Sequence, residues 1–303
     1  MKFGAYEDII HITSKWTGER MPDGRPKVSN DILNRLRKLT LEEAHGPLWN
    51  AGYHYQFEGG LKMTHPGVKL VGRAVTGVMA PKRPDLDSIL IEYGMKEEGR
   101  QGTMNQWVID SLVEDDVVVV DMYDKIYEGT FVGGNLTTAI ATRTKRGGSV
   151  IWGGVRDLEQ MVQIPGIQNY YRGTDPMWIR DTTLVGLNTP CRIGGAICLP
   201  GDVVFGTMSG VLFIPPHLAE HCVVSAEKSH VRDIFAFQRL EEGLYSTAQV
   251  DTAWTLAMME DFLDWMKAAP VAAEYRHLAW EQELDEARKK EAEGGDAIPQ
   301  VRP

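Results

Sequence analysis

Four consecutive valines, Val117–Val120, constrain the fold of this chain more than any other segment. β-branched side chains favour strands, and an apolar run without alternating polar residues is typical of a strand that is buried on both faces. Such strands occur in sheets whose two faces are covered by other elements. The valine run therefore predicts a buried strand inside a layered sheet.

Other strand and helix patterns alternate with this run along the middle of the chain. Strands are predicted at residues 70–78, 149–152, 183–187, 196–199, 203–206 and 211–214. Helices are predicted at residues 31–52, about 98–112, 136 to about 145, and through most of 216–293. The alternation indicates an α/β protein with a mixed central sheet flanked by helices.

The two ends of the sequence differ from this middle part. Residues 1–30 are polar and are interrupted by glycines and prolines, so we predict an N-terminal arm that does not belong to a core. Residues 31–240 are expected to form the domain that carries the chemistry. Residues 241–303 are expected to form a C-terminal helical extension and tail.

The charge and cysteine content limit the classes of partner. The formal net charge is −10, which disfavours binding to a phosphate backbone, and the short basic segment Arg143–Arg146 is interpreted as a solvated helix end. The N-terminus lacks the pattern of a signal peptide, and no apolar run approaches the ~20 residues that span a bilayer. Three scattered cysteines are expected to be buried thiols. We therefore expect a cytoplasmic protein without nucleic-acid or membrane partners.

The strongest chemical signal is a segment that starts at Gly133-Gly134 and ends at Arg156-Asp157, with a predicted helix and strand between them. Backbone N–H groups at Gly134, Asn135 and Leu136 would point out of the helix N-terminus, which attracts anions.

Two side chains at the end of this segment could complete a binding site. Arg156 could pair with a carboxylate and polarise a keto oxygen, and Asp157 offers the hard oxygen ligand that suits Mg²⁺ or Mn²⁺. Together with the helix N-terminus, they predict a site for a small α-keto acid. A purely structural ion pair explains the Arg156-Asp157 dipeptide as well on chemistry alone.

Two further cations are candidates for the same site. Lys125 lies between the valine strand and the glycine turn, so it could reach a bound substrate. Arg172 is either a second contact for a substrate anion or a loop anchor.

The segment Gly133–Asp157 resembles the signature of the RraA-like family, which includes 4-hydroxy-4-methyl-2-oxoglutarate/4-carboxy-4-hydroxy-2-oxoadipate aldolases. The family pattern is a glycine turn, a helix rich in Ala and Thr, and a strand that leads into Val-Arg-Asp. Further segments resemble the family in the same order along about residues 40–235: Val71–Thr76, the loop Tyr171–Pro176, Gly194-Gly195, Pro200–Val204 and Gly210–Pro215.

The resemblance implies a swivelling β/β/α fold and a divalent-metal-dependent lyase, assembled as a homotrimer or homohexamer with sites between subunits. It implies that Arg156 binds the pyruvyl carboxylate and keto oxygen and stabilises the enolate. Asp157 would be a direct ligand of Mg²⁺ or Mn²⁺. The amides of residues 134–136 would hold the substrate carboxylate.

The sequence departs from the family pattern at positions where the family has carboxylates: Asn135, Gly153, Gln160 and the segment Thr207–Ser209. Asn135 would therefore reach the metal through a water molecule. The resemblance also implies an acid from a neighbouring subunit, for which Asp233 and Glu227 are the candidates.

Three functions follow from these features. The first is retro-aldol cleavage of a small carboxylated hydroxy or keto acid that releases pyruvate, with oxaloacetate decarboxylation as a side activity. The second is a sugar-acid or hydroxy-acid dehydratase or hydratase, which would use the same metal-stabilised enolate. The third is a non-catalytic, protein-binding regulator, although retention of both Arg156 and Asp157 favours an enzyme.

Overall fold

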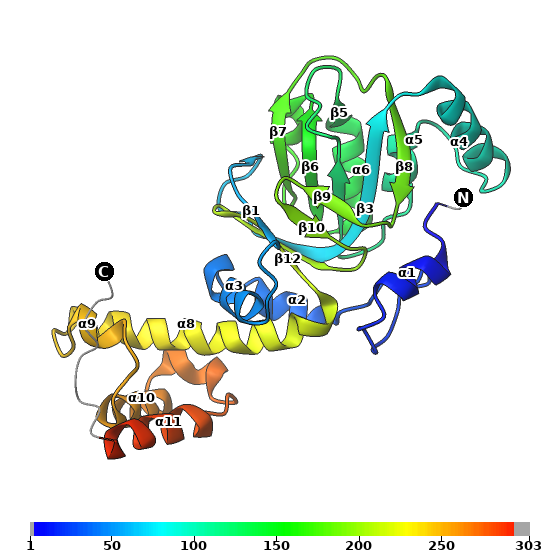
Figure 1. Ribbon diagram of the computed structural model, residues 1–303. Coiled ribbons are helices and arrows are strands. Elements are labelled where there is room, and N and C mark those ends of the chain that lie inside the picture. Colours follow the sequence, from blue (N-terminus) through cyan, green and yellow to red (C-terminus); the bar gives the residue numbers. More distant parts are fainter. Residues whose placement is uncertain (1–2, 294–303) are drawn as a thin grey trace. The chain divides into compact units, whose positions relative to one another are not determined.

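A ten-stranded mixed sheet forms the centre of the first of two compact units, which ends at Val223 (Figure 1). The structure is a computed structural model, and it describes residues 3–293. The strand order is β1-β12-β11-β3-β4-β6-β7-β2, with β5 beside β6 and β8 beside β3. The strands are β1 (Phe57–Glu58), β2 (Lys62–Met63), β3 (Leu70–Pro81), β4 (Asp116–Asp121), β5 (Thr130–Val132), β6 (Gly148–Val155), β7 (Gln168–Thr174), β8 (Thr182–Leu187), β11 (Val203–Thr207) and β12 (Gly210–Ile214).

The valine run lies in β4, and all four side chains are fully buried. Val118 and Val120 belong to one hydrophobic cluster, whereas Val117 and Val119 belong to another on the opposite face. β4 pairs in parallel with both β3 and β6, and β3 pairs antiparallel with β11. The prediction of a buried strand in a mixed α/β sheet is confirmed.

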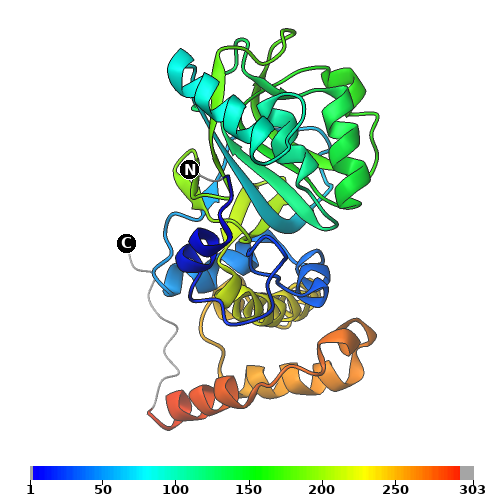
Figure 2. The ribbon, with the colours of Figure 1, turned by 90° about the vertical axis from the view of Figure 1, so that its right-hand side faces the viewer.

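Different elements cover the two faces of the sheet. Helices lie along one face of the sheet (Figures 1 and 2). Their buried side chains belong to the same cluster as Val118 and Val120. The hairpin of β9 (Cys191–Ile193) and β10 (Ala196–Cys198) supplies side chains to the cluster on the other face. The helices of the first layer are α4 (Pro84–Lys96), α5 (Met104–Asp110), α6 (Gly134–Thr144) and α7 (Leu158–Met161).

The prediction that residues 1–30 lie outside the core is wrong. Helix α1 (Tyr6–Ile12) buries Ile9 completely, and the side chain of Arg25 is only 1% exposed. The Arg25 guanidinium donates hydrogen bonds to both carboxylate oxygens of Asp116, at 2.9 and 3.0 Å. A charged residue is compatible with burial here because Arg25 has its acidic partner inside the protein.

Several helix boundaries also differ from the predictions. The single helix expected at 31–52 is two helices, α2 (Asn30–Leu36) and α3 (Leu41–Asn50), because Thr40 and Glu43 form a capping box that starts the second one. The helix expected at about 98–112 is the shorter α5, and the preceding α4 was not expected.

Strand β7 corrects the prediction of a loop at residues 171–176. Its first residues, Gln168 and Asn169, are buried in the structure. No strand was predicted there because both side chains are polar. Thr64 donates a hydrogen bond to the Gln168 side chain at 3.0 Å, and Ser149 donates one to the Asn169 side chain at 2.8 Å.

The second unit begins at Val224, inside the long helix α8 (Ala219–Glu241). Its helices pack around an aromatic cluster that includes Phe235, Trp254, Phe262 and Trp265. The helical content agrees with the helices predicted after residue 216. The other elements are α9 (Thr247–Val250), α10 (Leu256–Ala268), a 3₁₀ helix (Pro270–Tyr275) and α11 (Glu281–Ala292).

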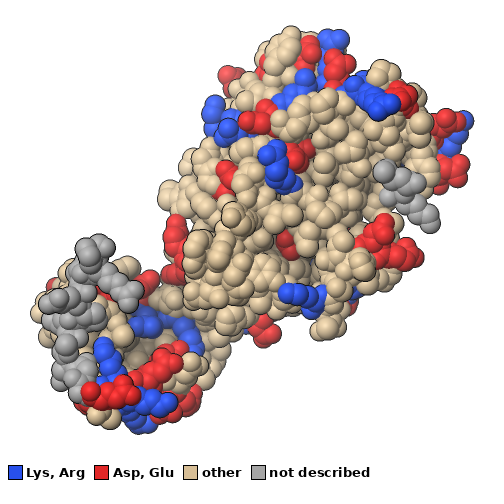
Figure 3. All heavy atoms as spheres, in the orientation of Figure 1, with Lys and Arg blue, Asp and Glu red and all other residues tan. Residues whose placement is uncertain are grey.

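The surface carries both signs of charge, as Figure 3 shows for one face. In the basic segment 143–146, Arg143 pairs with Asp110 at 2.8 Å and Arg146 pairs with Asp115 at 3.1 Å, so both guanidinium groups already have acidic partners. Among the residues that the structure describes, no helix is long and apolar enough to cross a membrane.

Candidate functional site

Arg156 and Asp157 lie immediately after the carboxyl end of β6. The residues that follow parallel strands lie at the same edge of the sheet. β6 is parallel to β4, β5 and β7, so all four strands end on the same side. β5 leads directly into Gly133 and the start of α6. The topology therefore brings the Arg-Asp pair and the N-terminus of α6 together, at the edge where open α/β sheets bind ligands.

The glycine turn is in direct contact with the acidic residue. The Gly134 N–H donates a hydrogen bond to Oδ2 of Asp157 at 3.2 Å. A side chain on Gly133 would collide with this same Oδ2 atom and would come within 2.9 Å of Cγ of Arg156. A larger residue at position 133 would therefore force the Asp157 and Arg156 side chains to move, which favours glycine there.

The backbone of Asp157 adopts a left-handed conformation, with φ 54° and ψ 40°. Residues other than glycine rarely adopt it, although aspartate tolerates it better than most. Such conformations cost on the order of 1–3 kcal/mol and cluster at functional sites. This conformation is compatible with a functional role for Asp157, and Asp115, Asp124 and Asp181 also have a positive φ.

The exposure of the pair argues against a purely structural role. The Arg156 and Asp157 groups approach to 3.3 Å, and their side chains are 38% and 27% exposed. Ion pairs of this accessibility contribute about 0–1 kcal/mol to stability, which does not exceed the cost of the strained backbone. Both groups remain accessible to a ligand.

The other predicted site residues lie near this edge and differ in their exposure and in their hydrogen bonds. Asn135 and Leu136 occupy the first turn of α6, with Asn135 exposed. Lys125 is half-buried in the loop between β4 and β5, and its carbonyl accepts the Gly154 N–H at 3.0 Å. The backbone N–H groups at the start of α6 and the Lys125 side chain, the predicted substrate contacts, therefore lie close to the strand ends.

Arg172 lies on β7 and is already anchored. Its Nε donates to Asp124 at 3.0 Å, and its guanidinium stacks 4.4 Å from the centre of the Trp152 ring. Its partners account for its position without a substrate. Asp233 lies on α8 in the second unit, and its predicted role at a neighbouring subunit's site stays a prediction.

At this site Asp157 offers one carboxylate, a donor of the kind that a hydrated divalent cation accepts. Within residues 3–293, no three His, Cys, Asp or Glu side chains converge in a way that could hold a metal ion. Mg²⁺ is commonly bound by one or two carboxylates and keeps several water molecules, so Asp157 alone fits as its direct ligand from this chain. The Gln160 amide lies close by, since a side chain on Gly134 would collide with its oxygen.

Asn105, which no sequence pattern singles out, positions the strand that leads into the glycine turn. It is almost completely buried, and its amide donates a hydrogen bond to the carbonyl of Phe131 in β5 at 2.9 Å. Its own oxygen accepts from Thr103 at 2.6 Å. A buried asparagine at a helix start, three residues after Gly102, is too common a pattern to identify this role.

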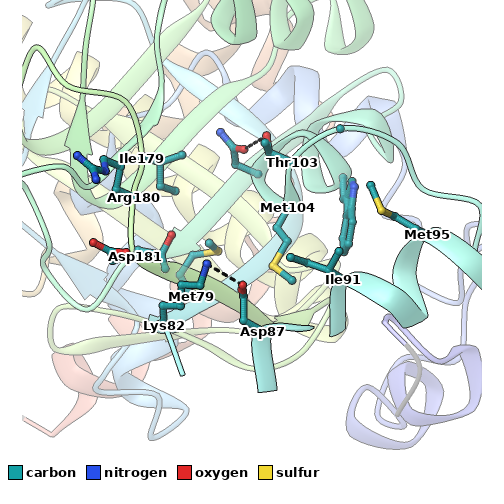
Figure 4. Close-up of a pocket in the computed structure, with 14 residues that line it drawn as sticks. Met79, Lys82, Asp87, Ile91, Met95, Thr103, Met104, Ile179, Arg180 and Asp181 are labelled. Atoms are coloured by element: carbon teal, nitrogen blue, oxygen red, sulfur yellow. Dashed lines mark hydrogen bonds and ion pairs between the residues drawn. The ribbon is translucent and has the colours of Figure 1, made fainter. Parts of the chain in front are cut away.

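Asn105 also lines the cavity drawn in Figure 4, which has a volume of about 410 Å³. The cavity lies beyond the carboxyl end of β3, between α4, α5 and the start of β8. Its walls include Met79, Ile91 and Met104, and its ion pair joins Lys82 to Asp87 at 3.0 Å. Neither Arg156 nor Asp157 lines this cavity, so it does not form part of the Arg-Asp site.

Comparisons with known proteins agree with this architecture. The family model described as RraA-like, Aldolase/RraA, matches residues 40–213, which is more than half of the chain. A Halalkalibacterium halodurans protein, provisionally named a 4-hydroxy-4-methyl-2-oxoglutarate aldolase, is 26% identical over 118 residues. That alignment covers 39% of this chain and 55% of the relative, so the chain spans about half the length of this curated protein.

Two solved structures share the fold. RraAS2 of Streptomyces coelicolor, described as an unusual member of the RNase ES inhibitor RraA protein family, has a TM-score of 0.58 and 22% identity, over 71% of this chain and 98% of its own. An uncharacterized protein of Pseudomonas syringae pv. tomato has a TM-score of 0.60 and 20% identity, over 75% of this chain and all of its own. At these identities the likeness establishes the fold alone, and the family follows from the match over residues 40–213: the chain belongs to the RraA-like family.

Proposed function

We propose that this chain is a divalent-metal-dependent lyase that cleaves a small carboxylated hydroxy or keto acid by a retro-aldol reaction and releases pyruvate. The observation that carries the proposal is the exposed Arg156–Asp157 pair, held against the N-terminus of α6 by a strained backbone. Membership of the Aldolase/RraA family and the name of the Halalkalibacterium relative support the same reaction class.

The roles of the residues follow from their charge and position. The guanidinium of Arg156 binds the substrate carboxylate and the adjacent keto oxygen, and its charge stabilises the enolate that carbon–carbon cleavage leaves behind. The free N–H groups at the start of α6, including those of Asn135 and Leu136, orient the same carboxylate. Asp157 would hold Mg²⁺ or Mn²⁺, which supplies Lewis-acid polarisation of the keto oxygen when bound.

The test is pyruvate release from 4-hydroxy-4-methyl-2-oxoglutarate and from oxaloacetate, with Mg²⁺, with Mn²⁺ and with a chelator. We expect metal-dependent pyruvate that falls at least about 100-fold in Arg156→Ala and Asp157→Ala, because each removes a group that acts on the developing charge. Arg143→Ala, which removes an exposed arginine away from the site, is the matched control and should keep its activity. No pyruvate from folded, metal-loaded protein would refute the aldolase reaction.

A sugar-acid or hydroxy-acid dehydratase is the second candidate. The uncharged Gln160 amide beside Gly134, in place of a family carboxylate, favours it because proton transfer would then use a different group. Formation of a 2-keto acid from sugar acids, without pyruvate, would support this reaction. Metal binding without turnover of either substrate class would favour a protein-binding regulator.

We also propose a homotrimer or homohexamer in which α8 contributes Asp233 to the site of a neighbouring subunit. Two inactive variants, Arg156→Ala and Asp233→Ala, should then regain part of the activity when they are unfolded together and refolded as mixed oligomers. Light scattering gives the number of subunits. Absence of complementation in mixed oligomers would contradict a shared site.

A further inference from the structure

A second cavity, distinct from the Arg-Asp site and from the cavity of Figure 4, lies where the N-terminal segment packs beside the sheet. Its volume is about 430 Å³, within the range of small-molecule pockets. We call it the N-terminal cavity. Its lining residues come from Ile12–Trp16 after α1, from Tyr53 and Gln56, from Ile197–Asp202, and from Pro215–His217 after β12.

The walls of the N-terminal cavity are mainly apolar. Its apolar lining residues are Ile12, Trp16, Ile197, Leu199, Pro215 and Pro216. A cavity of this size filled by water alone would leave this surface hydrated, which is unfavourable. The walls therefore suit a ligand with an apolar body.

A cluster of donors stands at one end of the cavity. The Lys15 ammonium donates to the hydroxyl of Tyr53 at 3.4 Å, and this hydroxyl lies 3.1 Å from Nε2 of His217. Among residues 3–293, Lys15 has no carboxylate in ion-pair contact. Burial and the charge of Lys15 lower the pKa of His217, which favours the neutral imidazole. A cation without an acidic partner, beside a hydroxyl and an imidazole that share one hydrogen bond, is suited to a carboxylate.

A carboxyl group also lines the cavity. Asp202 is 2% exposed, and its Oδ2 accepts the Leu199 N–H at 2.7 Å. In the part of the chain that the structure describes, Oδ1 receives no hydrogen bond. Burial raises the pKa of Asp202 to about 7, so near that pH the group is partly protonated and can donate or accept a hydrogen bond. Gln56 lines the same cavity, and its amide nitrogen is already engaged by the Phe213 carbonyl at 2.7 Å.

We propose that the N-terminal cavity is a second binding site, which takes a small apolar monocarboxylate with its carboxylate at Lys15, Tyr53 and His217 and a hydroxyl group at Asp202. The walls bury the body of the ligand, and the two polar groups fix its orientation. The site is separate from Arg156 and Asp157 and does not depend on the proposed lyase reaction.

The test is isothermal titration calorimetry of the full chain with benzoate, and with benzamide as its uncharged analogue. Benzoate should bind at least tenfold more tightly than benzamide. Lys15→Met should weaken benzoate binding about tenfold, and Ile197→Trp should abolish it by filling the cavity. Both positions are exposed, so the variants should fold, and circular dichroism checks this.

Two control variants locate the binding. Ile91→Trp fills the cavity of Figure 4 instead, and Arg156→Ala alters the Arg-Asp site; both should bind benzoate with unchanged affinity. A preference for 4-hydroxybenzoate over benzoate that disappears in Asp202→Ala, which removes both hydrogen-bonding oxygens, would support the inner contact. The proposal is overturned if benzoate and hexanoate do not bind wild-type protein at millimolar concentration, or if Ile197→Trp binds benzoate as well as wild type does.

Discussion

The buried carboxyl of Asp202 should make the stability of the first unit depend on pH in a defined direction. Its pKa is about 7 in the folded protein, against an ordinary value of 3.8. Between these two pH values the folded state keeps a proton that the unfolded chain has lost, so the free energy of unfolding falls as the pH rises. The contribution is fully present below pH 3.8 and is lost by about pH 7. Three pKa units correspond to about 4 kcal/mol.

The substitution Asp202→Asn isolates this effect. Asparagine has the same shape, can still accept the Leu199 N–H through its side-chain oxygen, and does not titrate. Other titrating groups contribute equally to both proteins, so they cancel in the difference. We compare the free energies of unfolding of the two proteins. The value for Asp202→Asn minus the value for wild type should increase by about 4 kcal/mol between pH 4 and pH 8.

The assay is urea unfolding followed by hydrogen exchange and mass spectrometry of peptides from β3 and β11, which report on the first unit separately from the second. The exposed carboxylate variant Asp110→Asn is the control, and its curve should follow wild type within about 0.5 kcal/mol. If wild type and Asp202→Asn lose stability in parallel as the pH rises, the buried carboxyl does not hold its proton near neutrality and the reasoning is wrong.

Three further substitutions test other features. Gly133→Ala should lower the proposed activity about 100-fold in the pyruvate assay, because its methyl group displaces Asp157; unchanged activity would contradict the close approach. Arg25→Met should reduce the free energy of unfolding by about 3–5 kcal/mol, since it leaves Asp116 buried without its partner, and the double variant Arg25→Met/Asp116→Leu should recover part of this loss in urea unfolding. Phe262→Ala should cost about 3–5 kcal/mol at the centre of the second unit, and unaltered hydrogen exchange in α10 would contradict that.

The parts of the fold that sequence patterns could predict are those set by local composition. Val117–Val120 predict a buried strand because no polar residue interrupts them, and that pattern alone requires cover on both faces. The parts that could not be predicted depend on long-range partners. Gln168 and Asn169 in β7 become acceptable in a strand only because Thr64 and Ser149 satisfy their side chains. Arg25 can be buried only because it pairs with Asp116, which lies far along the chain.

The candidate site shows the same division. The glycine turn and the Arg156-Asp157 dipeptide can be found in the sequence, and the parallel strand order explains why they meet. The left-handed backbone of Asp157 has no sequence signature, because aspartate also occurs in ordinary conformations. Nor do residue patterns reveal the anchoring of Arg172 on Trp152, which joins neighbouring strands.

The position of β3 in the sheet has a consequence for how the chain is made. β3 ends at Pro81, but β11, which pairs with it in antiparallel fashion, begins only at Val203. β1 likewise precedes its partner strand β12 by a long stretch of chain. At a synthesis rate of about 5–20 residues per second, β3 emerges on the order of ten seconds before the strand that covers its open edge. During that interval an apolar strand edge is available to other nascent chains, and we expect the newly made protein to need chaperone protection until β12 has left the ribosome.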